Sequence, residues 1–198
     1  MERTLLGGKF RLALTYAATA HNSQVKKGTE IPYVAHLLAV CALVLEHGGD
    51  EDEAIAGLLH DTLEDHPETV TREDLHKHFG AKVVRIVEGC TDTPPDYRGG
   101  VKPAWRKRKE HYLHHLRREG SHSARVSLAD KLCNARSILA DYRRVGDELW
   151  SRFNAGKEDQ LWYYRELLGA FREIGAPARM LEEFSEVVSE LDRLTRAV

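Results

Sequence analysis

The chain has 198 residues, 42% of them hydrophobic, and a net charge of −2 at pH 7. This length suits one compact domain with a buried core, and the charge argues against a nucleic-acid binder or an acidic tail. No apolar run approaches the roughly 20 residues that span a membrane, and three widely spaced cysteines without a CxxC pair indicate free thiols in a reducing compartment. We therefore expect a cytoplasmic protein that binds neither membrane nor nucleic acid.

The first part of the chain has the pattern of successive helices. Apolar residues at helical spacing predict a helix over residues 9–22, whose apolar stripe ends at His21. After a loop, a second helix is expected from about residue 34 to 46, with His36 on an apolar face, where a lone histidine is usually a core residue. Two glycines end it, and Asp50 is expected to cap the next helix, over residues 51–64.

The end of this third helix carries a dense cluster of ionisable groups, His60, Asp61, Glu64 and Asp65. On one continuous helix an imidazole and three carboxylates would project from nearly the same surface. Like charges crowded in this way cost about 0.2–0.5 kcal/mol for each exposed i,i+4 pair. A bound cation would remove that cost, so the cluster indicates a metal site.

Two short helices and a long loop follow. Thr71 and Asp74 have the spacing of a capping box for a helix that ends at Gly80, and residues 82–90 predict another. Prolines and glycines make residues 91–103 too irregular for a regular element. Loops of this length in compact domains often serve as lids or binding loops.

The next expected helix, residues 105–118, is strongly basic. It holds six lysine and arginine residues and one acid, Glu110, so it is either a solvated face or an electrostatic rim for a polyanion. His111 and His115 form an i,i+4 pair, but no carboxylate accompanies them at matching spacing. A metal site on this helix is therefore disfavoured.

The C-terminal half contributes one acid to an apolar helix. Ser121 or Ser123 is expected to cap a helix over residues 124–143, in which Asp130 lies among apolar residues. An isolated buried carboxylate is very costly, so Asp130 must be paired, capped or ligated.

The remaining pattern completes an all-α fold. Residues 157–174 predict one helix, and a break at residues 175–177 precedes a last one. No alternating strand pattern exceeds four residues. The last helix either covers the core or pairs with a second subunit, so both a monomer and a homodimer remain open.

Four residues from these helices form a candidate metal-binding set of two imidazoles and two carboxylates. They are His36, His60, Asp61 and Asp130. With positions left open for water and substrate, this set suits an octahedral ion such as Mn²⁺ or Fe²⁺, whereas tetrahedral Zn²⁺ would leave less room.

Six blocks of this sequence resemble the HD-domain metal-dependent phosphohydrolases, and within them the alarmone-hydrolase branch of the RelA/SpoT homologues. The blocks occur in the family's order and roughly its spacing, at residues 21–29, 32–36, 58–65, 79–80, 87–92 and 128–137. Such ordered agreement is more specific than the His60-Asp61 pair alone. The resemblance implies a single HD domain over residues 1–198, with the motif core at 10–140 and C-terminal helices at 147–198.

The resemblance also implies an activity. In the family a divalent ion, usually Mn²⁺, is held by residues that match the four candidate ligands, and Glu64 and Asp65 position or activate the attacking water. The implied substrate is a small nucleotide, guanosine tetra- or pentaphosphate, whose 3′-pyrophosphate is removed to release pyrophosphate and GDP or GTP. The metal lowers the pKa of bound water while a carboxylate takes the proton.

Substrate contacts are implied at four positions, Lys26, Lys27, Asn134 and Ser137. The chain departs from the family where Leu37 follows the first ligand, where His66 follows the carboxylate pair, and over residues 152–164. Two alternatives therefore stay open: a phosphohydrolase of another nucleotide, such as a 5′-nucleotidase or triphosphohydrolase, and a metal-bound sensor that binds the alarmone without cleaving it.

Overall fold

The structure is a computed structural model that describes residues 4–92 and 103–196, and within those ranges it is all-α, as the sequence predicts. Its elements in chain order are α1 (Gly8–Ala20), α2 (Val34–Glu46), α3 (Glu51–Leu59), α4 (Thr62–Asp65), α5 (Arg72–Phe79), α6 (Ala81–Cys90), α7 (Trp105–Glu119), the 3-10 helix η1 (Gly120–His122), α8 (Ala124–Val145), the 3-10 helix η2 (Gly146–Arg152), α9 (Lys157–Glu173) and α10 (Ala178–Arg196). Most of the predicted loop, at residues 93–102, lies outside the described residues.

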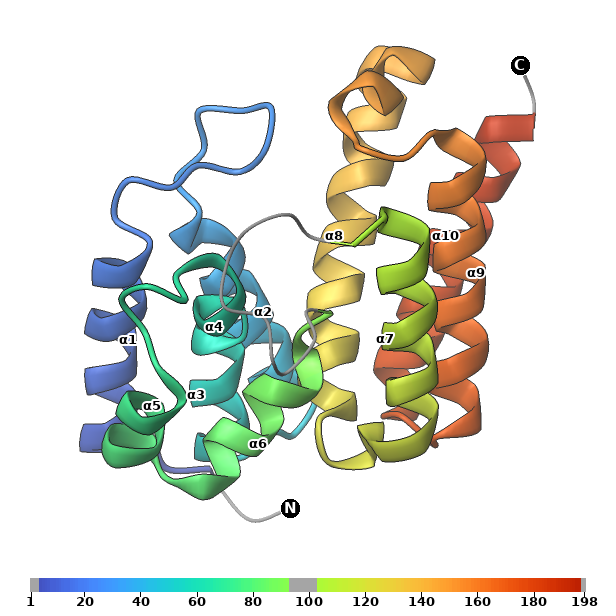
Figure 1. Cartoon of the computed structure of the whole chain (residues 1–198). Coiled ribbons are helices and arrows are strands. Elements are labelled where there is room, and N and C mark those ends of the chain that lie inside the picture. The colour runs from blue at the N-terminus through green and yellow to red at the C-terminus, as the bar shows by residue number, and fades with distance from the viewer. Residues whose placement is uncertain (1–3, 93–102, 197–198) are drawn as a thin grey trace.

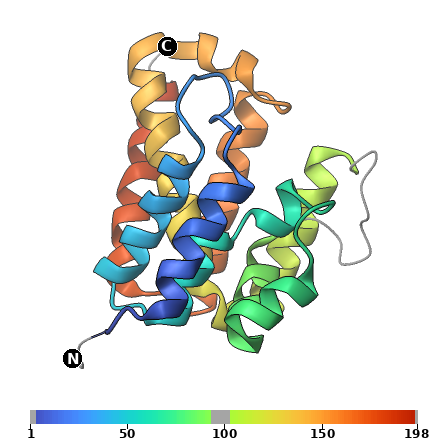
Figure 2. The same cartoon turned by 90° about the vertical axis from the view of Figure 1, so that its left-hand side faces the viewer.

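Helix α8 is the element that joins the two halves of the molecule. It packs against α9 and α10 of the C-terminal half and against α2 and α3 of the N-terminal half (Figure 1). The view turned by 90° shows the short helices α5 and α6 grouped away from α10 (Figure 2). Buried apolar residues from both halves form one core cluster. Residues of α8 therefore lie against both α2 and α3.

The last helix covers this core. Met180, Phe184, Val188 and Leu191 of α10 are buried within the chain, and the helix contacts α8 and α9. The helix α10 therefore covers the core, one of the two roles that the sequence left open. Separately, no helix in the described ranges has the length and apolar character needed to cross a membrane.

The helix predicted over residues 51–64 is not continuous. It stops at Leu59 and resumes as α4 at Thr62, with His60 and Asp61 in the junction. The Thr62 hydroxyl donates to the Leu59 carbonyl at 2.7 Å, and the His60 imidazole donates to the Gly57 carbonyl at 2.9 Å. Side chains thus take two carbonyls that would otherwise continue the helix. Because His60 and Asp61 lie in this junction, the four ionisable groups do not project from one continuous helix. The prediction of one continuous helix over residues 51–64 is therefore wrong.

The predicted helix starts are mostly confirmed. Asp50 forms a full capping box with Glu53, and Thr71 forms one with Asp74. The cap expected for α8 is wrong: Ser123 stands at the N-cap position, but its hydroxyl donates to the Gly120 carbonyl instead. The preceding 3-10 turn supplies that nearer acceptor.

Candidate metal centre

Three segments distant in sequence bring His36, His60 and Asp130 together. His36 lies in the first turn of α2, His60 directly after α3 and Asp130 in α8, and all three are at most 4% exposed. The Nε2 of His36 is 3.3 Å from Nε2 of His60 and 3.2 Å from Oδ1 of Asp130. Among the described residues, this is the one group of three or more histidine, cysteine or acidic side chains with ligand atoms within 4.8 Å of one another.

Asp61 lies beside this group of three. Its Oδ2 is 2.9 Å from Nε2 of His60 and 3.8 Å from Nε2 of His36, and it accepts a hydrogen bond of 2.5 Å from the Tyr33 hydroxyl. The Asp61 side chain is 23% exposed, so it is the candidate ligand most open to solvent. The four predicted ligands are therefore neighbours.

The donor set suits a divalent cation. Because Nδ1 of His60 donates to the Gly57 carbonyl, Nε2 is the nitrogen that faces the carboxylates. Burial alone would lower the pKa of His60, but the charges of Asp61 and Asp130 raise it well above its ordinary value. Burial raises the pKa of Asp61, and the opposing effect of His60 brings it down to about 2. The same two carboxylates would offer negative charge and oxygen ligands to a metal ion at this position.

Asp130 is stabilised by partners that follow it on α8. Lys131 Nζ donates to its Oδ2 at 2.7 Å, and Asn134 Nδ2 donates to its Oδ1 at 2.6 Å. Burial raises the pKa of Asp130, but the charge of Lys131 and hydrogen bonds from the imidazoles lower it well below its usual range. Lys131, whose Nζ lies 5.0 Å from the centre of the Tyr112 ring, was missed in the sequence, although a cationic partner was one of the ways in which a buried acid could be satisfied.

Glu64 and Asp65 lie in α4, outside the ligand group, and each has its own anchor. Glu64 Oε2 accepts hydrogen bonds from the Thr91 hydroxyl at 3.1 Å and from the Asp92 amide at 3.4 Å. Asp65 Oδ2 accepts one from Gln24 Nε2 at 2.8 Å. The two carboxylates are thus held by different segments of the chain. Residues after α6 bind Glu64, and the loop after α1 binds Asp65.

The predicted substrate residues separate into two pairs. Lys26 Nζ donates to the Ser137 hydroxyl at 3.0 Å, and both line a cavity of about 400 Å³ that His36 also borders. Lys27 Nζ instead donates to Asn154 at 3.1 Å, and Asn134 contacts Asp130. Further lining residues, missed in the sequence, are Ile31, Ala35, Ala39, Ala42, Leu43, Glu46, Cys133 and Arg136.

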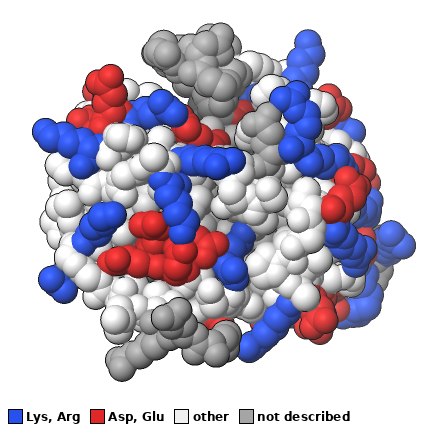
Figure 3. Space-filling view, turned by 90° about the horizontal axis from the view of Figure 1, so that it is seen from below, with Lys and Arg blue, Asp and Glu red and all other residues white. Residues whose placement is uncertain are grey.

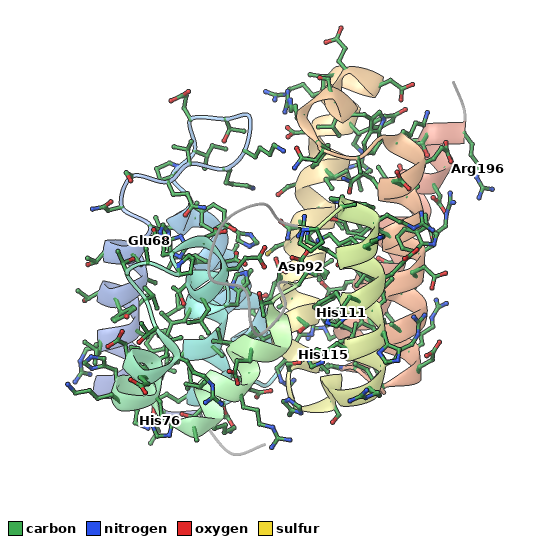
Figure 4. All side chains as sticks on the ribbon, viewed as in Figure 1. Glu68, His76, Asp92, His111, His115 and Arg196 are labelled. Carbon is green, nitrogen blue, oxygen red and sulfur yellow. The ribbon has the colours of Figure 1, made fainter. Side chains whose placement is uncertain are left out.

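The basic helix α7 is paired with acids from other elements. Arg106 contacts Asp159 at 2.9 Å as well as Glu110, and Arg108 and Lys109 contact Asp92 at 2.6 and 2.5 Å. Asp92 lies between the end of α6 and α7 (Figure 4). Viewed from below, basic and acidic side chains are intermixed on the surface (Figure 3). These pairs favour a structural face over a rim for a polyanion.

The other predictions about reactive side chains are also answered. His111 and His115 lie on α7 (Figure 4), apart from the ligand group that the described residues form. All three cysteines, Cys41, Cys90 and Cys133, are free thiols as predicted.

A family model described as HD domain matches residues 13–161. The chain is 37% identical over 144 residues to the guanosine-3′,5′-bis(diphosphate) 3′-pyrophosphohydrolase MESH1 of Xenopus tropicalis, across 70% of this chain and 72% of that protein. Its counterpart from Danio rerio is 40% identical over 145 residues, across 70% of this chain and 71% of that protein. A solved structure of a metazoan ortholog of SpoT, which hydrolyzes ppGpp and plays a role in starvation responses, is 25% identical, with a TM-score of 0.75 over 95% of this chain and 98% of that one. The chain belongs to the HD domain family.

Proposed function

We propose that this protein is a metal-dependent phosphohydrolase that removes the 3′-pyrophosphate of guanosine tetra- or pentaphosphate. The products are pyrophosphate and GDP or GTP. The observation that carries this proposal is the buried group of His36, His60 and Asp130, with Asp61 beside it, next to a cavity that contains Lys26. The activity named for the MESH1 relatives supports the choice of reaction and substrate.

The proposed cofactor is one divalent ion, held by the two imidazoles and the carboxylates of Asp61 and Asp130. The mixed nitrogen and oxygen donors favour Mn²⁺, with Fe²⁺ or Zn²⁺ as the other candidates. When bound, the ion lowers the pKa of a coordinated water and polarises a phosphoryl oxygen. Lys131 donates to Oδ2 of Asp130. This contact fixes the carboxylate so that Oδ1 faces the two imidazoles.

Glu64 and Asp65 are the proposed catalytic carboxylates. Neither belongs to the ligand group, and each is fixed by hydrogen bonds through one oxygen. In the proposed reaction a water oxygen bonds to the phosphorus attached to the 3′ oxygen, and the bond between that phosphorus and the 3′ oxygen breaks. The carboxylates orient the water and accept one proton from it, and the transfer of that proton to the departing 3′ oxygen releases a hydroxyl group and restores the carboxylates.

The nucleotide is proposed to bind in the cavity beside His36. Lys26 and Ser137 already share a hydrogen bond there, and a lysine close to the metal supplies the positive charge that a phosphate needs. Lys27 and Asn134 are proposed as outer contacts, from positions next to Lys26 and one turn before Ser137 on α8.

The wider assignments follow from the same features. We propose one domain over residues 1–198, because helices of both halves share one core. A monomer or homodimer acting on a small nucleotide in the cytoplasm, without nucleic acid or membrane, agrees with the paired surface charges and the free thiols.

The test is a substrate panel. Purified protein loaded with Mn²⁺ is incubated with guanine and adenine nucleotides, and the products are separated by anion-exchange chromatography. Pyrophosphate from guanosine tetraphosphate, lost in an Asp130→Asn variant, is the expected result. Orthophosphate from a nucleoside monophosphate would identify a 5′-nucleotidase instead. Alarmone binding without any product would identify a sensor.

A further inference from the structure

A polar network of the buried His21 and the half-buried Gln24 and Tyr33 adjoins Asp61 and Asp65. We propose that these are positioning residues: Tyr33 holds Asp61 in place as a metal ligand, and Gln24 holds Asp65 in place for turnover. The inference rests on the proposed metal centre and deepens it. It assigns roles to residues from a segment, between α1 and α2, that contributes no ligand of its own.

Tyr33 contacts the ligand oxygen itself. Its hydroxyl donates to Oδ2 of Asp61 at 2.5 Å, the same oxygen that lies 2.9 Å from Nε2 of His60. The phenol ring is stacked on His21, with 5.2 Å between ring centres, and packs at 5.4 Å against His36. Two imidazoles therefore fix the ring, and the ring fixes the orientation of Asp61.

Gln24 makes the equivalent contact with Asp65. Its Oε1 accepts a hydrogen bond of 2.6 Å from His21 Nδ1 and lies 3.1 Å from His66 Nε2. With the carbonyl side of the amide occupied in this way, the amide nitrogen is directed at Asp65, to which it donates at 2.8 Å. His66, one of the departures from the family pattern, thus belongs to this network.

His21 joins the two halves of the network. It stacks on Tyr33 and donates to Gln24, and the Tyr33 amide donates to the Gln24 carbonyl at 2.8 Å. His21 is 2% exposed, and its Nε2 has no hydrogen-bond partner among the described residues. A buried imidazole with an unsatisfied nitrogen stabilises the fold less than an apolar side chain would. We infer that the role of His21 is to fix the orientation of Tyr33 and Gln24.

The first experiment measures metal affinity. Tyr33→Phe removes one oxygen and keeps the ring between its two imidazoles, so the fold is retained. We expect its dissociation constant for Mn²⁺, measured by calorimetry, to rise about 10- to 100-fold, the usual effect of losing a partner of a metal ligand. Its kcat should recover at saturating Mn²⁺. The matched control is Tyr142→Phe, which removes a hydroxyl bound to Asp147 at 3.1 Å, far from the metal centre, and leaves both quantities unchanged.

The second experiment measures turnover. Gln24→Met keeps the length of the side chain but removes the donor to Asp65. Because Asp65 is outside the ligand group, we expect an unchanged Mn²⁺ dissociation constant, an unchanged KM and a kcat lowered about tenfold or more. Gln24→Glu, which places a second carboxylate against Asp65, should lower kcat at least as far.

The outcomes separate this inference from the function on which it rests. A wild-type protein that binds no Mn²⁺ overturns the metal centre and the inference together. A wild-type protein that binds Mn²⁺ but cleaves no alarmone overturns the proposed reaction and the role of Gln24, while the affinity of Tyr33→Phe still decides the role of Tyr33. Wild-type affinity in Tyr33→Phe, or wild-type kcat in Gln24→Met, overturns the corresponding positioning role alone.

Discussion

Asp61 and Glu64 are three residues apart, yet their carboxylates contact different residues of the described chain. Asp61 faces the two imidazoles, so removing its carboxylate takes away one of the two anionic ligands and leaves Asp130 alone to balance the charge of the cation. We expect Asp61→Ala to lose bound metal and all detectable hydrolysis, with metal content measured by elemental analysis after gel filtration. Retained metal in this variant would mean that Asp61 is not a ligand.

Glu64 has a different expected phenotype. Its anchors are Thr91 and the Asp92 amide, not the ligand group, so Glu64→Ala should keep its metal and lose turnover by about 10²-fold or more, the scale of a positioned acid or base. Glu68→Ala, at an exposed position in the same segment (Figure 4), is the matched control and should turn over normally. Full activity in Glu64→Ala would remove this residue from the mechanism.

These single-residue roles show how far a sequence can be interpreted. Asp130 was recognisable because a carboxylate among apolar helical neighbours must have a partner. His36 alone was expected to be a core residue, and it became a candidate ligand only together with His60, Asp61 and Asp130. Tyr33 was not recognisable in this way, because its hydrogen bond to Asp61 spans 28 residues and nothing in its neighbourhood along the chain requires it. Asn134 was predicted as a substrate contact from its position one turn after Asp130, and its hydrogen bond to Asp130 is a further contact that the sequence did not indicate.

At the scale of elements, Asp92 ties α7 to the residues that anchor Glu64. Burial raises the pKa of Asp92, but the charges of Lys109 and Arg108 lower it to about 2, from an ordinary value of 3.8. Because the pKa is lower in the folded state, the carboxylate contributes stability above pH 4 that is lost as the pH falls toward 2. The shift corresponds to about 2 kcal/mol of unfolding free energy.

The measurement is chemical unfolding of Asp92→Asn and wild type at pH 7 and near pH 2.5. We expect the variant to be less stable at pH 7 by about 2 kcal/mol or more, since two cations lose their partner, and the difference to shrink at the lower pH. The control is Asp159→Asn, which breaks the exposed pair with Arg106 and should cost less than about 1 kcal/mol. A difference that is independent of pH would exclude the ion pair as its cause.

Helix boundaries and helix partners were not equally predictable. Capping boxes are local, so the starts of α3 and α5 could be read directly from the sequence. The junction at His60 and Asp61 depends on side chains taking backbone carbonyls, for which the apolar pattern of α3 gives no signal. Apart from Glu110 of α7 itself, the acids that pair with α7 come from α9 and from Asp92, and a count of charges within one helix cannot include them.

For the whole molecule, the metal centre lies where α8 meets α2 and the end of α3, so bound metal should stabilise the two halves of the chain together. An ion at 100 times its dissociation constant adds about 2.7 kcal/mol to the free energy of unfolding. For a chain of this size that is a rise in Tm of roughly 5–10 °C, measurable by differential scanning calorimetry with Mn²⁺ and with EDTA.

The decisive comparison for this stabilisation is between two sites. Asp130→Asn removes the ligand that α8 contributes, and we expect it to abolish the Mn²⁺-dependent rise in Tm. His111→Gln with His115→Gln changes the histidine pair on α7, outside the ligand group, and should leave the rise intact. If the rise persisted in Asp130→Asn and disappeared in the double variant, the stabilising ion would bind on α7. Metal stabilisation would then be independent of the contact between α8 and α2 that assembles the proposed active site.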